Sequence, residues 1–354
     1  MLVSARERIG AASVAALLIA DLVAVVVVGS PRHAEAVGIP PTSAPATSTT
    51  TTRPPVGVYP LTGLPAYSTR LLPRPALSVK VDNAPDARPQ LGLNSADLVT
   101  EELVEGGLTR FLATFQSRDA ATVGPIRSAR PVDADLLREL GGGIFAYSGA
   151  SAGALAPVQQ RSGSVLLSPE RGATVFDRVP GRPAPANLFA STTALYAAGH
   201  QLSAHLVPPP PLFHYSAQPP DAPAAHTLTL AFSANSSSGW TGSGGVWERT
   251  QDGAPARLAD GSVITADNVV VLSVATRPSG IYDVRGNQTP LTIFAGSGTC
   301  WILRDGVVVK GTWQRPADDV PIVQLVGADG LAIALKPGRT WMELLPTPST
   351  PSIS

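Results

Sequence analysis

Arg127, Ser128 and Arg130 stand together directly before a predicted helix that begins after Pro131. Guanidinium groups and a hydroxyl donate hydrogen bonds that suit a carboxylate or a phosphate, and the unpaired N–H groups at a helix start attract anions. This segment therefore predicts an anion-binding site. The alternative is that both arginines pair with carboxylates of the fold itself.

Three acidic residues form a second group, because a strand end at Asp82 and a hairpin turn after Glu102 and Glu105 would bring them together. Two carboxyl groups with different pKa values can act as general acid and base, as in glycoside cleavage, and carboxylates also bind divalent cations. The alternative is ion pairing within the fold. The remaining members of this candidate site are Asn83, beside Asp82, and the possible cationic partners Arg88, Arg110, Arg127 and Arg130.

Ser151 lies in a Gly-Ala-Ser-Ala-Gly sequence that matches G-x-S-x-G, after a predicted strand and before a predicted helix. That context is the one in which a serine hydrolase carries its nucleophile. Asp177 followed by His200 or His205 would complete the required order along the chain. A tight glycine-containing turn explains the same sequence without any catalysis, and we favour it.

Other kinds of site are disfavoured by composition. The 354 residues include 26 basic and 26 acidic ones, so the formal net charge is zero and no nucleic-acid partner is expected. The five histidines and the single cysteine, Cys300, form no metal-binding motif. We therefore expect no metal and no cofactor.

The elements that must position these residues fall into two predicted domains. Residues 58–212 alternate strands with short helices, and two apolar runs flank Glu105-Gly106-Gly107 as in a β-hairpin, so an α/β or α+β domain is expected. Residues 227–346 contain short apolar runs separated by turn residues. Asp305-Gly306 and Asp329-Gly330 are hairpin signals, so this second domain is expected to be mostly antiparallel β.

The rest of the chain is expected to be a leader, linkers and a tail. Residues 9–28 are almost wholly apolar and follow Arg6 and Arg8, so residues 1–36 predict a signal peptide or a retained transmembrane helix with the N-terminus inside. Residues 37–57 are rich in Thr, Pro, Ser and Ala and predict a disordered linker. Residues 213–226 are expected to link the domains, and residues 347–354 to form a disordered tail.

Short motifs along most of the chain resemble the YerB-like family of bacterial envelope lipoproteins, whose two domains have no assigned function. The resemblance covers nearly all of residues 60–346. It rests on Pro60-Leu-Thr-Gly-Leu-Pro65, Val81-Asp82-Asn83, Ala87-Arg88-Pro89-Gln90, Glu105 to Phe111, Gly124 to Arg130, Pro185-Ala186-Asn187-Leu188, Asn268 to Val271, Gly311-Thr312-Trp313 and Pro337 to Trp341. It implies an envelope address and a two-domain layout, and it supplies no catalytic residue. Many relatives carry a lipid-modified cysteine where this chain has only an apolar segment.

These observations favour an extracytoplasmic binding or scaffolding protein at the cell membrane, or one secreted after cleavage. Its expected ligand is an anionic cell-wall polymer, another phosphate- or carboxylate-bearing molecule, or an envelope protein. Two other functions stay open. One is a hydrolase or transferase that acts on a cell-wall polymer through a carboxylate pair or Ser151, and the other is a protein–protein adaptor. The sequence does not decide whether the protein is an enzyme, and it favours a role without catalysis.

Overall fold

The structure is a computed structural model that describes residues 54–283, 286–315 and 322–354. The predicted signal or transmembrane helix and most of the predicted linker lie outside the described residues. Within the described ranges, no helix is both long enough and apolar enough to cross a membrane.

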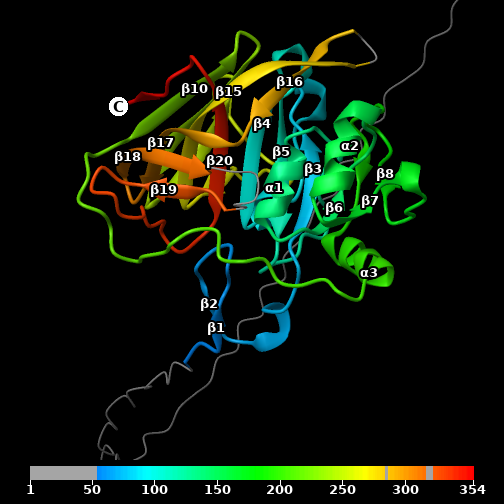
Figure 1. Ribbon diagram of the computed structural model, residues 1–354, viewed down its shortest axis with the longest axis horizontal. Coiled ribbons are helices and arrows are strands. Elements are labelled where there is room, and N and C mark those ends of the chain that lie inside the picture. Colours follow the sequence, from blue (N-terminus) through cyan, green and yellow to red (C-terminus); the bar gives the residue numbers. More distant parts are fainter. Residues whose placement is uncertain (1–53, 284–285, 316–321) are drawn as a thin grey trace, which may run out of the picture. The chain divides into compact units, whose positions relative to one another are not determined.

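Eleven strands form one large sheet (Figure 1). Ten of them follow the order β19-β18-β17-β15-β20-β4-β5-β3-β6-β7, and β16 pairs with the outer half of β15. Their bounds are β3 Leu77–Asp82, β4 Leu98–Leu103, β5 Thr109–Phe115, β6 Gly143–Ala146, β7 Ser164–Leu167, β15 Asn268–Tyr282, β16 Gln288–Ile293, β17 Gly296–Arg304, β18 Val307–Arg315, β19 Gln324–Val326 and β20 Thr340–Pro346.

The large sheet is covered on both faces. Successive side chains of a strand point to opposite sides of a sheet, so neighbouring residues of one strand report on the two faces. Along β15, Val269 and Val271 belong to one buried cluster, whereas Val270 and Leu272 belong to another. Central strands buried on both faces have nearly continuous apolar sequences, and β15 shows this pattern from Val269 to Leu272.

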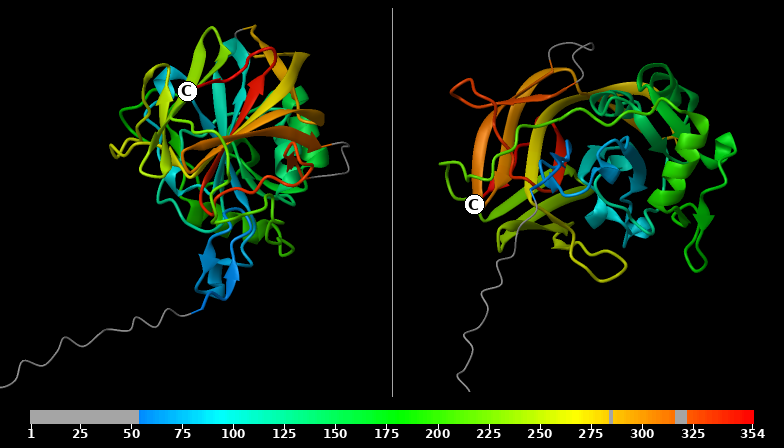
Figure 2. Two further views of the ribbon diagram at one scale, coloured as in Figure 1. Left: turned by 90° about the vertical axis from the view of Figure 1, so that its left-hand side faces the viewer. Right: turned by 90° about the horizontal axis from the view of Figure 1, so that it is seen from below.

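One face packs against α1 (Asp133–Glu139) and α2 (Ala152–Arg161), which supply apolar residues to the same cluster as Val270. The opposite face is covered by α3 (Thr192–Leu202) and by a second sheet. The two longer helices begin at serine caps, since the side chains of Ser151 and Ser191 accept hydrogen bonds from the N–H groups of Ala154 and Ala194. All three helices lie toward the β3–β7 end of the large sheet (Figures 1 and 2).

The second sheet consists of six strands, in the order β13-β12-β11-β10-β21 with β14 beside β12. The strands are β10 Thr227–Ser233, β11 Ser236–Ser243, β12 Val246–Gln251, β13 Ala254–Pro255, β14 Thr265–Ala266 and β21 Ser352–Ile353. Two small hairpins and five short 3₁₀ turns complete the described fold: β1 Gly57–Val58 with β2 Pro65–Ala66, β8 Asp177–Arg178 with β9 Leu188–Phe189, η1 Thr69–Leu71, η2 Pro85–Ala87, η3 Leu93–Ser95, η4 Glu105–Gly107 and η5 Pro169–Arg171.

The two predicted domains contribute to the same large sheet. Strand β20 pairs in parallel with β15 on one side and with β4 on the other, and Thr340 of β20 stands opposite Leu98 of β4. Residues 203–226, which connect the two regions, contain no helix or strand, but Leu212 and Phe213 within them are buried in the core.

The expected α/β or α+β region is found over residues 58–212, which hold all three described α-helices, and the expected β region over residues 227–346, whose described elements are strands. The turn at Asp305-Gly306 joins β17 to β18, and both residues have positive φ, as a two-residue hairpin turn requires. The expected hairpin at Asp329-Gly330 is reduced to a single bridge between Val326 and Ala332.

The final residues also differ from expectation, because β21 lies within the predicted disordered tail. Ser352 and Ile353 pair with β10, and the N–H groups of His226 and Thr227 both donate to the carbonyl of Ser354. Backbone pairing with an available sheet edge thus holds a segment whose composition indicated no structure.

Candidate functional site

An open cleft of about 910 Å³ lies beside the ends of β3, β4 and β5. One wall of the cleft is formed by an extension of the large sheet, in which β15 pairs with β16 alone beyond Val274 (Figure 1). We call this extension the β15–β16 arm and define it as residues 275–283 and 286–293. The cleft is lined by Asp82, Ala84, Pro85, Asp86, Val104, Glu105, Gly106, Leu108, Arg110, Arg127, Ser128, Arg130, Gly149, Ala150, Ser151, Pro185, Asn235, Tyr282, Asp283, Asn287 and Thr289.

The arginine-bearing loop is held in place by its backbone. Arg127 N–H donates to the carbonyl of Lys80 on β3, and Ala129 N–H donates to the carbonyl of Gly149 on the segment that precedes α2. The loop therefore lies between β3 and that segment. This backbone pairing directs the side chains of Arg127 and Ser128 to the cleft without the need for a regular element.

Asp82, Arg110 and Arg127 meet at the floor of the cleft. Asp82 is the last residue of β3 and stands directly opposite Arg110 on β5. Arg127 Nε donates to Asp82 Oδ2 at 2.8 Å, and Arg110 Nε lies 3.7 Å from Asp82 Oδ1. One carboxylate thus faces two guanidinium groups.

Glu105, at the turn between β4 and β5, holds the third arginine. Glu105 Oε2 accepts from both Nε and Nη2 of Arg130, and its other oxygen accepts from the hydroxyl of Thr289 on the arm. Burial alone would raise the pKa of Glu105, but the charge of Arg130 and the hydrogen bonds from Thr289 and Arg130 outweigh it and hold this pKa below its ordinary value.

The floor has more hydrogen-bond donors than acceptors. Three guanidinium groups face two carboxylates, and neither terminal nitrogen of Arg127 has a partner among the described residues. Arg110 is 7% exposed, and its buried Nε has no hydrogen bond. Burial, with the charges of Arg130 and Arg127 adding to it, lowers the pKa of Arg110 to about 10, so Arg110 stays charged at neutral pH. A surplus of fixed positive charge with free N–H groups can bind an anion.

The sequence hypothesis of an anion bound at the helix start after Pro131 does not match the geometry. Asp133 occupies that position, since its Oδ2 accepts from Arg130 N–H at 2.7 Å and its Oδ1 accepts from Lys80 Nζ at 2.7 Å. Glu102 also pairs with Lys80 and does not line the cleft. Lys80, Glu102 and Asp133 form a fully buried cluster that the sequence did not indicate.

Glu102→Gln is expected to change how stability depends on pH. Burial raises the pKa of Glu102 from 4.5 to about 7, and Asp133 adds to this, whereas Lys80 and Arg130 oppose it. Because the folded protein holds this proton more tightly than the unfolded chain, the free energy of unfolding falls as pH rises between those values. The variant lacks this loss, so its stability relative to the natural protein should rise by about 2 kcal/mol from pH 5 to pH 8.

Urea unfolding at several pH values measures this difference. Glu248→Gln is the matched control. Glu102 still titrates in this variant, so its free energy of unfolding should change with pH as that of the natural protein does. A pH-independent difference between Glu102→Gln and the natural protein would contradict the assignment.

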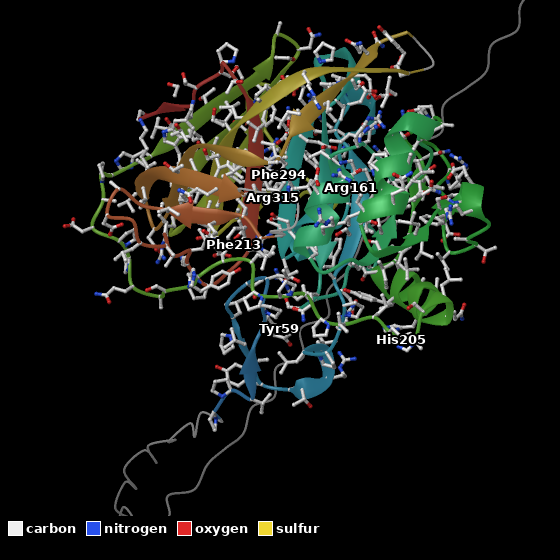
Figure 3. All side chains as sticks on the ribbon, in the orientation of Figure 1. Tyr59, Arg161, His205, Phe213, Phe294 and Arg315 are labelled. Carbon is white, nitrogen blue, oxygen red and sulfur yellow. The ribbon has the colours of Figure 1, made fainter. Side chains whose placement is uncertain are left out.

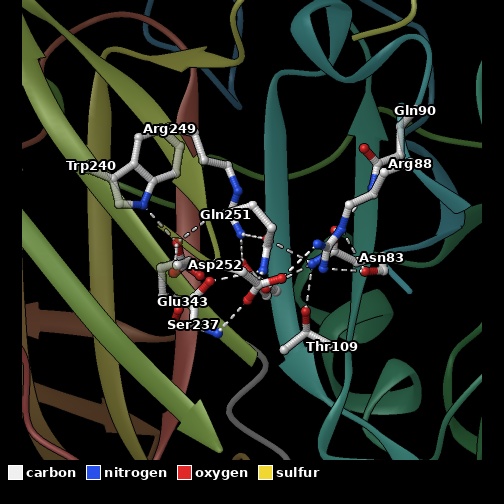
Figure 4. A network of polar contacts seen from close by, with 12 residues as sticks. Asn83, Arg88, Gln90, Thr109, Ser237, Trp240, Arg249, Gln251, Asp252 and Glu343 are labelled. Atoms are coloured by element: carbon white, nitrogen blue, oxygen red, sulfur yellow. Dashed lines mark hydrogen bonds and ion pairs between the residues drawn. The ribbon is translucent and has the colours of Figure 1, made fainter. Parts of the chain in front are cut away.

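Asn83 and Arg88 lie in a separate polar network behind the floor (Figure 4). Arg88 donates to the carbonyl of Asn83 through both Nε and Nη2, and its Nη1 lies 2.6 Å from Asp252. The Asn83 amide donates to Gln251 and Thr109. Both residues were predicted as ligand-binding candidates, and neither lines the cleft.

Ser151 lines the cleft but lacks the surroundings of a nucleophile. Its φ of −67° and ψ of 155° are those of an ordinary helix cap, whereas a nucleophile elbow is a strained turn. Neither His200 nor His205 is among the lining residues. His205 lies low in the view, near α3, whereas the β15–β16 arm is at the top of the same orientation (Figures 1 and 3). The glycine-turn interpretation therefore fits the observed geometry.

The carboxylate-pair hypothesis gains little support either. Asp82 and Glu105 do share the cleft, but each accepts hydrogen bonds from arginine, and the lowered pKa of Glu105 opposes a role as general acid at neutral pH. Across residues 54–283, 286–315 and 322–354, no three His, Cys, Asp or Glu side chains group closely enough to hold a metal ion.

Sequence reasoning missed the arm. Tyr282, Asn287 and Thr289 come from the second predicted domain, and Asn235 from the turn between β10 and β11. Residues 275–282 do not alternate between apolar and polar and contain Pro278 and Gly280, so their pattern carried no signal that β15 continues past the main sheet. Nothing in the sequence indicated that this extension returns to the turn at Glu105.

Comparison with known proteins gives matches along most of the chain. Residues 61–205 match the family described as "Protein of unknown function (DUF3048) N-terminal domain", and residues 228–342 match its C-terminal domain. The Bacillus subtilis (strain 168) protein named "Putative lipoprotein YerB" is 27% identical over 302 residues, which cover 83% of this chain and 88% of that protein. The crystal structure of Bacillus subtilis YerB is similar with a TM-score of 0.71 and 25% identity, over 83% of this chain and 99% of that one.

Proposed function

The chain belongs to the DUF3048 family, which the YerB-like resemblance indicated, and from that premise we propose that it is a non-catalytic binding protein of the cell envelope. Its ligand is an anionic envelope component that binds in the cleft floored by Arg110, Arg127 and Arg130. The envelope address rests on the lipoprotein name of the Bacillus relative and on the apolar segment predicted for residues 9–28.

The observation that carries the binding proposal is the surplus of donors on the cleft floor. Arg127 is the most accessible member, with a side chain that is 27% exposed and two unpaired terminal nitrogens. Arg110 and Arg130 are nearly buried, so their charges are held in fixed positions before a ligand arrives. Preorganised donors of this kind lose little entropy on binding.

Arg127→Gln is expected to weaken anion binding about ten- to a hundredfold, because it removes charge-assisted hydrogen bonds worth about 1.5–3 kcal/mol. Retention of the purified full-length chain on cell walls, before and after extraction of their anionic polymers, measures the loss. Arg277→Gln is the matched control, since Arg277 is exposed on the arm and does not line the cleft. Equal retention of Arg127→Gln and the natural protein would refute the proposal.

A further inference from the structure

The cleft changes character between its floor and its rim. The floor presents donors, as described for Arg110 and Arg127. The rim presents acceptors: Asp86 is exposed on η2, and the side-chain oxygens of Asn235 and Asn287 have no donor among the described residues. A ligand that satisfies both ends has an anionic group at one end and hydroxyl donors at the other.

The orientation of the two amides is settled by their partners. Asn235 Nδ2 donates to the carbonyl of Gly106 at 3.1 Å, and Asn287 Nδ2 donates to Asp283 Oδ2 at 3.1 Å. Because the amide nitrogens are engaged with acceptors, the amide oxygens are left to accept from a ligand. An asparagine oxygen cannot satisfy a second anion, but it pairs readily with a hydroxyl.

Tyr282 adds an apolar surface at the rim. It is 58% exposed at the end of β15, and its hydroxyl accepts from Gln288 Nε2 at 3.2 Å, which steadies the ring. The face of an aromatic ring carries partial negative charge and attracts weakly positive groups, including the C–H bonds of a sugar ring. A volume of about 910 Å³ admits an organic molecule well beyond a bare phosphate.

We propose that the cleft binds an acidic saccharide, with the carboxylate or phosphate at Arg127 and Arg110 and the hydroxyls at Asn235, Asn287 and Asp86, and with the sugar ring against Tyr282. This inference rests on the proposed function and narrows its ligand to one chemical class. Tyr282 and Asn287 of the β15–β16 arm, with Asn235 and Asp86, supply the saccharide specificity, whereas Arg127 of the loop before α1 and Arg110 of β5 supply the charge.

Binding to the full-length chain is measured by titration with six probes: glucose 6-phosphate and glucuronic acid, the bare anions phosphate and acetate, neutral glucose, and the polyanion tripolyphosphate. Each acidic sugar is expected to bind at least tenfold more tightly than its matching bare anion and than glucose. Tyr282→Ala should weaken binding of the acidic sugars about fivefold and leave phosphate binding unchanged. Arg127→Gln should weaken both classes.

Tyr67→Ala is the control for Tyr282→Ala, because Tyr67 is also half-exposed and lies outside the cleft. Sugars and bare anions that bind equally, or a Tyr282→Ala effect no larger than that of Tyr67→Ala, would overturn the saccharide inference and leave the anion site standing. If none of the acidic probes binds, or Arg127→Gln changes nothing, the anion site itself fails. Tripolyphosphate that binds more tightly than both acidic sugars would point to a polyanion and also overturn the inference.

Discussion

Arg249→Met is expected to lower the free energy of unfolding by about 3–5 kcal/mol, because it leaves buried carboxylates without their counter-charge. Arg249, on β12 of the second sheet, is 1% exposed. It donates to Glu101 of β4 at 2.6 Å. It also donates to Glu343 of β20 at 3.0 Å (Figure 4). Arg249 therefore ties the second sheet to two adjacent strands of the large one.

The pH dependence of the Arg249→Met effect identifies its cause. Burial and the neighbouring Glu101 raise the pKa of Glu343 well above its ordinary value, and Arg249 opposes this rise. Without Arg249 the pKa of Glu343 rises further in the folded state, so the loss of stability should be larger at pH 8 than at pH 5. Urea unfolding at both values measures it. Arg277→Met, on an exposed arginine, should cost less than about 0.5 kcal/mol.

A stability loss for Arg249→Met that is equal at the two pH values would show that lost packing, and not stranded charge, accounts for the change. Arg249 also lies over the ring of Trp341, with its guanidinium carbon 4.6 Å from the ring centroid, so a packing contribution is present in either case. The methionine replacement keeps most of that apolar contact, which is why it is preferred to alanine.

Lys80→Met is expected to cost a similar amount, about 3–5 kcal/mol, for the same physical reason. Lys80 is fully buried, and its ammonium group contacts Glu102 and Asp133. Lysine occurs only at positions 80, 310 and 336 of the chain, and Lys310 is exposed. Lys310→Met is thus a matched control that should change stability by less than about 0.5 kcal/mol.

Thermal unfolding of Lys80→Met and of the double variant Lys80→Met/Glu102→Gln distinguishes the cost of stranded charge from the cost of altered packing. If stranded charge dominates, the double variant recovers part of the loss, since one of the two orphaned carboxylates is gone. A double variant that is less stable than Lys80→Met would contradict the proposed role of Lys80. The cluster lies directly behind Arg130, whose N–H also bonds Asp133, so its integrity bears on the cleft floor as well.

Local patterns predicted much of the fold. The alternation in β3, the glycine turn at Glu105 and the Asp305-Gly306 turn all depend on neighbours in sequence, and the structure contains each of these elements. The pairing of β20 with β4 could not be predicted in this way, because nothing near Thr340 or Leu98 specifies a partner so distant along the chain.

The charged residues and the predicted turns were enough to group most of the charged residues of the candidate site. Arg127, Arg130, Asp82 and Glu105 were grouped because a strand end and a hairpin turn limit where they can lie, and the structure brings them to one cleft. Glu102 was grouped with them through proximity in sequence to Glu105. Glu102 stands opposite Arg110 and shares its face of the sheet, but its carboxylate pairs with the buried Lys80 and does not reach the cleft.

The distance along the chain between β4 and β20 also determines how long one edge of β4 stays unpaired during synthesis. Strand β20 lies far along the chain from β4, so residues 98–103 emerge with one edge unpaired and remain so until residues 340–346 arrive. At synthesis rates of ~5–20 residues per second, that wait is on the order of ten seconds or more. An unpaired strand edge can pair with another chain, so the nascent protein is open to aggregation for the same period.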